Sequence, residues 1–451
     1  MDPKFINVLI LGFGFMFLFT AFQTMGNIEK TVLDSISADD PNFTGDGYIS
    51  LAIIYAVFAI CNWIAPPVIS LTGPRCAMLI GAVAYCSFMV SFLWPKTWLL
   101  YLVSALLGVG AAIIWTAQGA FLSKCSDATT ISRNSGIFWA MLQMSMFFGN
   151  LFVYFQFQGK THIDEQTRTL VFSVLIAVGI IGFFFLCALR SVEDTQVSHH
   201  NDNNDTDEDL EKPSSGVVVA FRNSVNLFFT REMLMLSLTF FYTGLELSFF
   251  SGVYSPSIGF TTQIGESAKQ LVGLSGIFIG VGEVFGGVAF GLLGTRITNK
   301  LGRDPIVILG FIIHIVAFFL IFLNLPNDAN LGDTKDIAYL NPPLASVALF
   351  CSFLLGFGDS CYNTQIYSLL GGVFAKKSTE AFSIFKFTQS VAAALSFVYS
   401  THLGLRAQMA ILVVFGTIGT IAFYLVEWAE RRKANAEKEM IKSSDESMVP
   451  S

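Results

Sequence analysis

The chain has 451 residues, of which 53% are hydrophobic and only 13% are charged, and its mean hydropathy is +0.62. A soluble fold of this size needs far more polar surface to cover itself, so the composition excludes a disordered protein, a cytosolic enzyme and a secreted module. It favours a polytopic membrane protein. The formal net charge is −7, but eight acidic residues lie in one stretch, residues 193–211, that contains no Lys or Arg. The remaining charges nearly balance, and we therefore predict no nucleic-acid partner.

Twelve apolar runs are long enough to cross a bilayer, which takes roughly 17–25 helical residues. The first run is too long for the apolar region of a cleavable signal peptide and lacks a small-residue cleavage site, so we expect it to remain as a span. In chain order, the predicted spans are residues 5–26, 48–69, 76–94, 98–122, 134–158, 169–190, 232–254, 270–293, 305–324, 343–372, 379–403 and 406–428.

The distribution of Lys and Arg predicts the orientation of these spans. With a cytoplasmic N-terminus, 18 of the 26 basic residues fall on the cytoplasmic side and seven on the other side. The positive-inside rule therefore places both termini in the cytoplasm. Asn42 then begins an Asn-Phe-Thr sequon in the first non-cytoplasmic loop, where we expect N-glycosylation. The sequence leaves both the plasma membrane and an endolysosomal membrane open as its location.

An acidic segment separates the first six spans from the last six. Its first part has no apolar periodicity, which is typical of a disordered linker. The part from Val217 to Phe229 is more apolar and predicts either a short helix at the membrane surface or a lead-in to the seventh span. The predicted parts are a six-helix bundle at 1–190, a largely disordered cytoplasmic linker at 191–230, a second bundle at 231–428 and a charged cytoplasmic tail, expected to fray, at 429–451.

The two halves contain similar strings at corresponding spans. Phe19-Thr-Ala-Phe-Gln23 in span one matches Tyr242-Thr-Gly-Leu-Glu246 in span seven, residue type by residue type. Gln118 in span four and Gln143 in span five have counterparts in Gln365 and Gln389, six spans later. The sequence therefore predicts an all-α polytopic membrane protein with twelve transmembrane helices in two six-helix pseudo-repeats. This is the plan of the major facilitator fold.

The loop between predicted spans eight and nine also resembles the major facilitator superfamily. Asn299-Lys300-Leu301-Gly302-Arg303 is similar to the end of that superfamily's loop motif, Asp-Arg/Lys-x-Gly-Arg, with Asn in place of Asp. The equivalent loop of the first half keeps only Gly73-Pro74-Arg75. The resemblance implies that Lys300, Gly302 and Arg303 set up a charge pair between helices on the cytoplasmic face.

Five further strings resemble the Unc-ninety-three-like branch of the superfamily, and this resemblance runs nearly end to end, apart from the acidic linker and the tail. It implies a twelve-span fold but no settled activity, because relatives in that branch include a potassium-channel accessory subunit and an escort for innate-immune receptors. The strings are Trp115–Gly119, Arg133–Trp139 with Phe148–Asn150, Tyr242–Glu246, Leu274–Gly280 and Gly356–Gln365.

Four ionisable residues lie inside predicted spans of the second half: Glu246, Glu283, Asp359 and Lys386. A charge at mid-membrane costs roughly 2.5–3.5 kcal/mol on insertion scales, so such residues mark candidate functional sites. At about 1.5 Å per residue, Lys386 should reach Asp359 or Glu283, whereas Glu246 should lie further out. The four residues predict either a cavity that contacts substrate or protons, or a paired charge cluster that locks helices together.

Glutamine side chains are the remaining candidates for the cavity wall. The alternative is that they bridge helices, where amide hydrogen bonds contribute about 0.6 kcal/mol on average. We recognise no metal site, nucleotide fingerprint or catalytic constellation, and we therefore predict no cofactor, no metal and no enzymatic activity. The candidate glutamines are Gln23, Gln118, Gln143, Gln365 and Gln389.

Two functions agree with these patterns. The first, which we favour, is secondary-active transport of an unidentified small solute by alternating access, with protons as the candidate coupling ion. The alternative is a non-transporting membrane regulator or trafficking partner of an ion channel or receptor. The predicted partners are accordingly the lipid bilayer, a small solute or protons, and, under the alternative, a channel or receptor.

Overall fold

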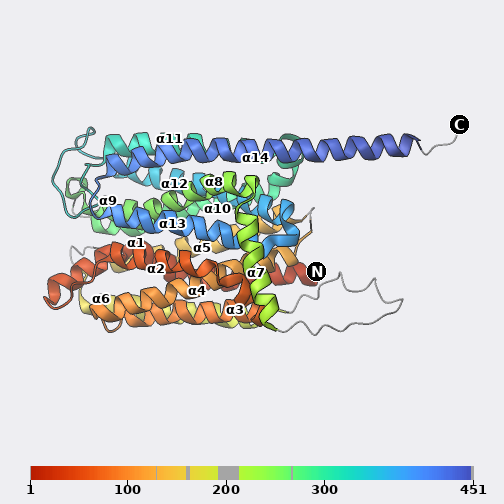
Figure 1. Ribbon diagram of the computed structural model, residues 1–451. Helices are drawn as coiled ribbons and strands as arrows, with labels where there is room; N and C mark the ends of the chain where they lie inside the picture. The colour runs from red at the N-terminus through yellow and green to blue at the C-terminus, as the bar shows by residue number, and fades with distance from the viewer. Residues whose placement is uncertain (1, 128–129, 159–162, 191–212, 266–267, 448–451) are drawn as a thin grey trace.

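The computed structural model describes residues 2–127, 130–158, 163–190, 213–265 and 268–447, which form a bundle of long helices running side by side (Figure 1). The first half contains α1 (Pro3–Asp39), α2 (Gly47–Asn62), α3 (Ala65–Ser91), α4 (Thr97–Lys124), α5 (Ile131–Gln156) and α6 (Glu165–Cys187). The rest contains α7 (Pro213–Phe228), α8 (Arg231–Ser248), η1 (Phe249–Tyr254), α9 (Ser255–Phe260), η2 (Thr262–Ile264), α10 (Ala268–Leu301), α11 (Asp304–Asn324), α12 (Ala345–Val373), η3 (Ala375–Lys377), α13 (Ser378–Ser400) and α14 (Leu405–Ser447).

Eleven helical segments in the described ranges are long and apolar enough to cross a membrane. The remaining predicted span corresponds to α2, which is apolar but has only 16 residues. The all-α polytopic fold class is therefore confirmed. The start of α1 and the end of α14 lie at the same end of the bundle (Figure 1), which we call the inner end, and the opposite end is the outer end.

The second predicted span, residues 48–69, is interrupted near its middle. α2 ends at Asn62, and α3 begins at Ala65 after two intervening residues, directly before Pro66 and Pro67. Proline has no backbone N–H and its ring clashes with the preceding turn, which explains why one helix does not continue through this segment. The chain then turns at Gly73, whose φ of 75° favours glycine.

Two other spans extend further than their apolar runs. α1 continues to Asp39 rather than ending at residue 26, and α8 continues through the π-helical η1 into α9, which ends at Phe260. The apolar run marks only the segment that fits the hydrocarbon core, whereas polar residues with adequate helix propensity prolong the helix. As a consequence, Glu29 lies inside α1, and Glu246 lies at the middle of a continuous 30-residue span.

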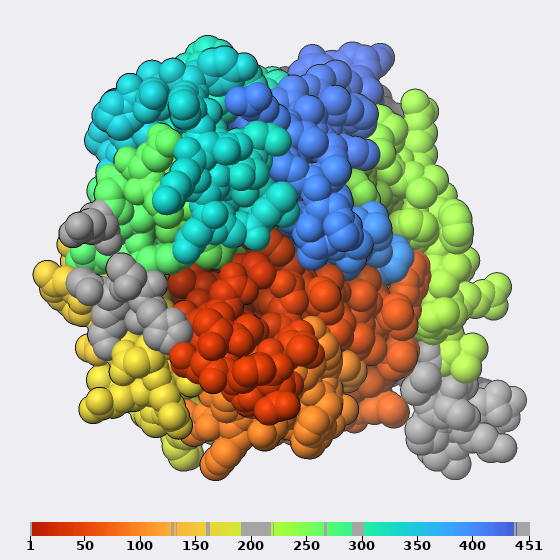
Figure 2. Space-filling model, turned by 90° about the vertical axis from the view of Figure 1, so that its left-hand side faces the viewer, coloured from red at the N-terminus to blue at the C-terminus, as the bar shows by residue number. Residues whose placement is uncertain are grey.

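Glycines allow α10 of the second half to pack closely against α5 of the first half. A Cβ added at Gly273, Gly276 or Gly280 would lie within 3.0 Å of Tyr154, Asn150 or Met146, respectively, all on α5. Small residues at such positions let two membrane helices approach until their backbones nearly touch. Seen from the outer end, the red and orange first half lies against the cyan and blue second half (Figure 2).

The segment between the halves contains a helix of its own. Residues 191–212 of the predicted linker lie outside the described residues, but α7 is a separate helix that crosses the spans (Figure 1). Phe228 of α7 packs against Trp63 and Phe387, which belong to different halves, with ring centroids 5.7 and 6.1 Å away. The tail also differs from expectation, because α14 remains helical to Ser447 instead of fraying.

We predict that Asn42 carries an N-glycan, because it lies exposed in the loop between α1 and α2 at the outer end. Glycosidase treatment of the protein from mammalian cells should increase its gel mobility, and Asn42→Gln should abolish this shift. Asn204→Gln, which removes a sequon on the predicted cytoplasmic side, serves as the control and should preserve the shift. Loss of the shift with Asn204→Gln alone would contradict the predicted orientation.

Candidate functional site

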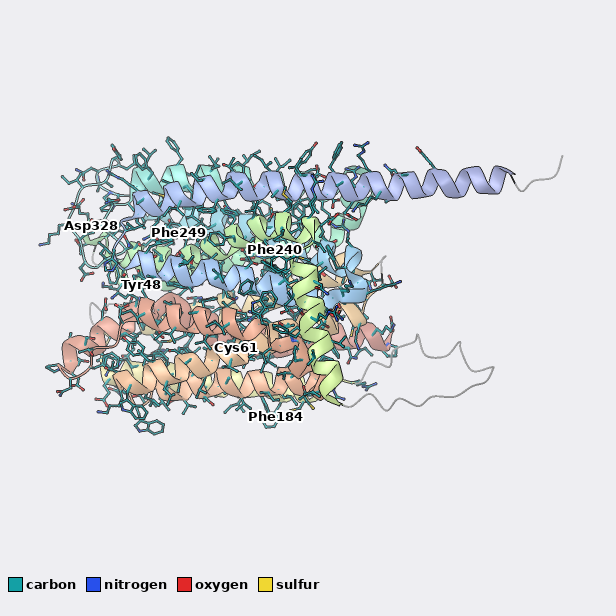
Figure 3. The ribbon with its side chains drawn as sticks, viewed as in Figure 1. Tyr48, Cys61, Phe184, Phe240, Phe249 and Asp328 are labelled. Atoms are coloured by element: carbon teal, nitrogen blue, oxygen red, sulfur yellow. The ribbon has the colours of Figure 1, made fainter. Side chains whose placement is uncertain are left out.

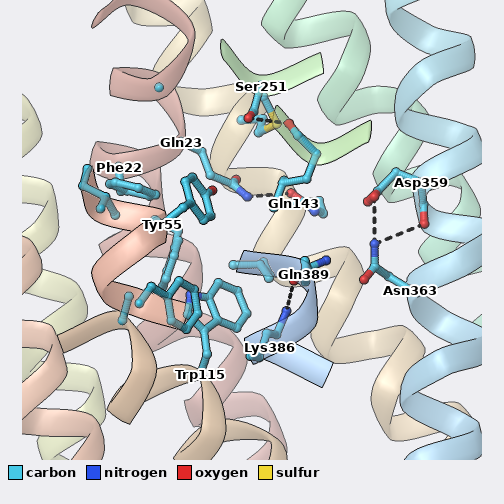
Figure 4. Close-up of a pocket in the computed structure, with 18 of the residues that line it drawn as sticks. Phe22, Gln23, Tyr55, Trp115, Gln143, Ser251, Asp359, Asn363, Lys386 and Gln389 are labelled. Atoms are coloured by element: carbon cyan, nitrogen blue, oxygen red, sulfur yellow. Dashed lines mark hydrogen bonds between the residues drawn. The ribbon is translucent and has the colours of Figure 1, made fainter. Parts of the chain in front are cut away.

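A cavity of about 80 Å³ lies between the two halves (Figure 4). A mostly apolar wall with a few convergent polar groups is typical of a small-molecule site. No cluster of three or more potential metal ligands occurs among the described residues. The aromatic wall includes Phe19, Phe22, Tyr55, Phe58, Tyr85, Trp115, Trp139 and Phe250, and the polar side chains are Gln23, Gln143, Ser251, Asp359, Asn363, Lys386 and Gln389.

Lys386 projects from α13 into this cavity and is 4% exposed. Its Nζ donates a hydrogen bond of 2.8 Å to Oε1 of Gln389, one turn further along the same helix. The ammonium group also lies 4.6 Å from the ring centroid of Trp115 and 4.4 Å from that of Phe385. Aromatic faces attract a desolvated cation. Among the described residues, Lys386 makes no ion pair with Asp359 or Glu283, which were its expected partners.

Asp359 and Asn363 form the opposite polar part of the wall, on α12. Nδ2 of Asn363 donates a hydrogen bond of 2.8 Å to Oδ1 of Asp359. The side-chain amide oxygen of Asn363, Oδ1, is buried without a hydrogen-bond partner in the described part of the chain. The sequence analysis missed Asn363. The sequence could have indicated Asn363, because it follows Asp359 by four residues, and residues four apart lie on the same face of a helix.

Two further carboxyl groups lie behind Asp359 and do not line the cavity. The carboxyl groups of Glu246 on α8 and Glu283 on α10 both lie close enough to that of Asp359 for electrostatic repulsion. Oε2 of Glu283 also accepts a hydrogen bond of 2.8 Å from the indole N–H of Trp139, which itself lines the cavity. The estimated depth of Glu246 was wrong, because the continuation of α8 into α9 moves this residue to mid-span.

His314 of α11 extends the carboxyl cluster away from the cavity. Its Nδ1 lies 2.9 Å from Oε2 of Glu246 and 2.6 Å from the hydroxyl of Tyr242, and its Nε2 lies 3.1 Å from the carbonyl oxygen of Leu355. A carbonyl only accepts hydrogen bonds, so Nε2 carries the hydrogen in this arrangement. His314 was not among the candidates named from the sequence, and no local pattern could have joined it to Glu246, 68 positions away.

The predicted glutamines divide between the cavity and other interfaces. Gln23 donates to Gln143 over 3.0 Å, accepts a hydrogen bond from the hydroxyl of Ser145 and lines the cavity with Gln143. Gln118 instead accepts a hydrogen bond of 3.2 Å from Tyr367, which connects α4 with α12. Gln365 donates to Thr364, and neither Gln118 nor Gln365 lines the cavity.

The first half contains a buried carboxyl group that the sequence analysis missed. Glu29 of α1 is fully buried, its nearest polar neighbours include Ser50 and Asp46, and neither of its oxygens has a hydrogen-bond partner in the described ranges. The predicted first span ended at residue 26, which placed Glu29 in a loop. Counting helix formers past the apolar run could have found it.

The two halves contact each other on both sides of the cavity. The hydroxyl of Tyr48 donates to the carbonyl oxygen of Asn330 over 2.9 Å, and that of Ser383 donates to the carbonyl oxygen of Asn62 over 2.5 Å. Figure 3 shows Tyr48 near the outer end and Cys61, next to Asn62, further towards the inner end. The cavity is therefore flanked by contacts between the halves in both directions.

The second-half loop motif forms a charge pair at the inner end. The Arg303 guanidinium lies 3.1 Å from a carboxylate oxygen of Glu427 on α14, and its Nε donates to Ser368 on α12 over 3.2 Å. Gly302 has a φ of 92°, which favours glycine. The side chain of Lys300 lies outside the described residues. In the first half, Nε of Arg75 is buried without a partner in the described part of the chain.

Known proteins resemble this chain both in sequence and in fold. The family model described as "Ion channel regulatory protein UNC-93" matches residues 42–424. The Xenopus tropicalis "UNC93-like protein MFSD11" is 46% identical over 442 residues, covering 96% of this chain and 98% of the relative. The human "Protein unc-93 homolog A" is 23% identical and covers 96% of this chain and 95% of its own length. The structure of the proton:xylose symporter XylE has a TM-score of 0.65 at 13% identity, covering 93% of this chain and 95% of the symporter.

We predict that Glu427→Gln lowers the stability of the protein, because it leaves the Arg303 guanidinium without its carboxylate partner. Glu427 is 2% exposed and Arg303 is 22% exposed, so the loss should be about 1–3 kcal/mol, visible as a lower thermal midpoint in detergent. The control is Asp333→Asn, which removes an exposed partner of Lys269 at the outer end and should change the midpoint little. Equal midpoints for the two variants would contradict a structural role for the pair.

We predict that Glu29→Gln leaves the thermal midpoint at neutral pH unchanged or raises it. The amide has a similar shape and removes the cost of a buried carboxyl group without a partner. Glu29→Ala, which instead opens a cavity between α1 and α2, should lower the midpoint and serves as the contrasting variant. A pronounced fall with Glu29→Gln would mean that the carboxylate has a partner in the folded protein.

Proposed function

The chain belongs to the UNC-93 family and has the major facilitator fold, as its sequence predicted, and we propose that it is a secondary-active transporter of a small solute, coupled to protons. The observation that carries this proposal is the cavity between the halves, whose wall contains buried groups of opposite charge. Eleven helical segments among the described residues are long and apolar enough to cross a membrane, and together with the fold they make it an integral, multi-pass membrane protein. We further propose that the inner end, with both termini, faces the cytoplasm.

Alternating access is supported by the position of the cavity at the interface between the halves. In folds built from repeats, transport proceeds by rocking one bundle against the other around a central site. The hydrogen bonds from Tyr48 to Asn330 and from Ser383 to Asn62 lie on opposite sides of the cavity. Breaking the contact between Tyr48 and Asn330 would open the cavity to the outer side. Breaking the contact between Ser383 and Asn62 would open it to the inner side, while the site stays in place.

Coupling to protons is supported by the three adjoining carboxyl groups of Glu246, Glu283 and Asp359. Three ionised carboxylates close together repel one another, and a proton on one of them removes part of that repulsion. Asp359 alone of the three lines the cavity, so it is the group through which the cluster would exchange protons. One neighbour of the same fold is described as a proton:xylose symporter, which is a property of that protein.

The description of the matched family model favours a second candidate function, regulation of an ion channel. In that role, the charge cluster would hold α8, α10, α11 and α12 in one arrangement, and the cavity would be incidental. The loop motif of the first half is incomplete, and Nε of Arg75 has no hydrogen-bond partner in the described part of the chain. Both features agree with a protein that does not alternate between outward-open and inward-open conformations. Proximity labelling in native cells would then identify a recurrent channel or receptor, and Asp359→Asn would leave that association intact.

We predict that Asp359→Asn abolishes transport while the protein stays folded. The protein would be reconstituted in liposomes with an imposed pH gradient, and a trapped pH-sensitive dye would report proton flux on addition of each metabolite from a panel. Removing the cluster carboxyl that lines the cavity should reduce solute-dependent flux by at least about 10²-fold, because acid–base groups contribute roughly 10²–10⁴-fold in catalysis.

The matched control is Asp333→Asn, which removes a carboxylate at the outer surface and should leave flux at the wild-type level. A folded wild-type protein that moves no protons with any metabolite class would count against transport and in favour of the regulator.

A further inference from the structure

The cavity presents two opposite charges that are not paired with each other. Asp359 and Lys386 are 1% and 4% exposed, and both line the cavity. Asp359 accepts from the amide of Asn363, and Lys386 donates to the amide of Gln389 (Figure 4). No ion pair joins Asp359 to Lys386 within the described residues, although their charges attract each other. The hydrogen-bond partner of each charged group is therefore a neutral side-chain amide rather than the other charged group.

Each charged group keeps unused hydrogen-bonding capacity. An ammonium group has three donors, and one of those of Lys386 is used by Gln389. On the other side, the side-chain amide oxygen of Asn363 is buried and has no hydrogen-bond partner in the described part of the chain, and the amide nitrogen of the same side chain donates to the carboxylate of Asp359. The cavity thus contains one pole that donates and is positive, and one pole that accepts and is negative.

We propose that the cavity binds a small zwitterionic solute with a primary ammonium group, a carboxylate and an apolar side chain, as in an amino acid. The solute's ammonium group binds the carboxylate of Asp359 and the side-chain amide oxygen of Asn363, and the solute's carboxylate binds Lys386. Its side chain packs against the aromatic wall that includes Phe22 and Trp115. This inference names the substrate class of the transport function proposed above and rests on it.

Charge compensation favours a zwitterion over a singly charged solute. A buried charge is stabilised only when a partner offsets its loss of hydration. A simple cation at Asp359 would enter a cavity that already contains the Lys386 ammonium, and a simple anion at Lys386 would face the carboxyl cluster behind Asp359. Like-charge juxtaposition in a desolvated site rejects ligands strongly. A zwitterion supplies both missing partners without changing the net charge of the cavity.

The test compares a zwitterion with analogues that lack one charge. Thermal stability of the purified full-length protein would be measured with L-leucine, with 3-methylbutylamine, which lacks the carboxylate, and with 4-methylpentanoate, which lacks the ammonium group. L-phenylalanine, phenethylamine and 3-phenylpropionate form a second set. We expect the zwitterion of at least one set to bind at least about tenfold more tightly than both of its analogues, because each analogue leaves one buried charge unpartnered. Equal or stronger binding of an amine or an acid, or no stabilisation by either zwitterion, would overturn the proposal.

Two variants test which residue binds the carboxylate of the solute and which binds its ammonium group. Lys386→Gln should weaken binding of the zwitterion and shift preference towards the amine, whereas Asp359→Asn should weaken it and shift preference towards the acid. Asp333→Asn, at the outer surface, should leave all affinities unchanged. Unchanged zwitterion affinity in both cavity variants would overturn the assignment. If either variant fails to fold, the comparison of the three ligands on the wild-type protein still decides the substrate class.

The two proposals can fail separately. Proton flux driven by an acid or an amine, with no response to either zwitterion, would retain the transport function and overturn the substrate class. Selective binding of a zwitterion without any flux in liposomes would support the site and contradict transport.

Discussion

The structure depends on how the second half stabilises four ionisable groups that are buried together. A buried charge without a partner destabilises a fold by several kcal/mol, so each group needs a specific neighbour. Glu283 accepts a hydrogen bond from the indole of Trp139, Asp359 accepts one from Asn363, and Lys386 donates one to Gln389. Glu246 lies beside His314, with Oε2 2.9 Å from Nδ1. The contacts of Glu283 and Glu246 join different helices, and they therefore fix the rotation of α5, α8, α10 and α11 about their axes more narrowly than apolar packing would, because an apolar face tolerates small rotations.

The contact between Trp139 and Glu283 connects this charge cluster to the first half. Trp139 belongs to α5, Glu283 belongs to α10, and these two helices pack against each other through the glycines of α10. An ionised carboxylate accepts a hydrogen bond more strongly than a neutral carboxyl group does. The charge state of the cluster therefore affects how firmly the halves hold together at the cavity. Under the proposed proton coupling, a proton entering at Asp359 and a movement between the halves would be linked through this hydrogen bond.

The sequence predicted the helices and several cavity residues, but it predicted few of the contacts. Long apolar runs identified membrane spans reliably, because only a helix satisfies its backbone groups in lipid. Hydropathy could not find the ends of α1 and α8, since both helices continue through polar residues, and this error concealed Glu29 and misplaced Glu246. Lys386 was correctly suspected of lying near Asp359, yet its hydrogen-bond partner is Gln389. Such a choice depends on helix rotation and side-chain rotamers, which a single sequence does not encode in any local pattern.

The arrangement of partners also separates the two interpretations of the charge cluster. If Asp359 and Lys386 served only to lock helices, a direct ion pair between α12 and α13 would be the most effective arrangement. Instead, the hydrogen bonds of both residues run along their own helices, to Asn363 four positions on and to Gln389 three positions on, and such bonds tie no two helices together. The ties between helices lie behind the cavity, from Glu246 to His314 and from Glu283 to Trp139. Within the carboxyl cluster, Glu246 and Glu283 therefore contact other helices behind the cavity, whereas Asp359 lies with Lys386 at the cavity surface.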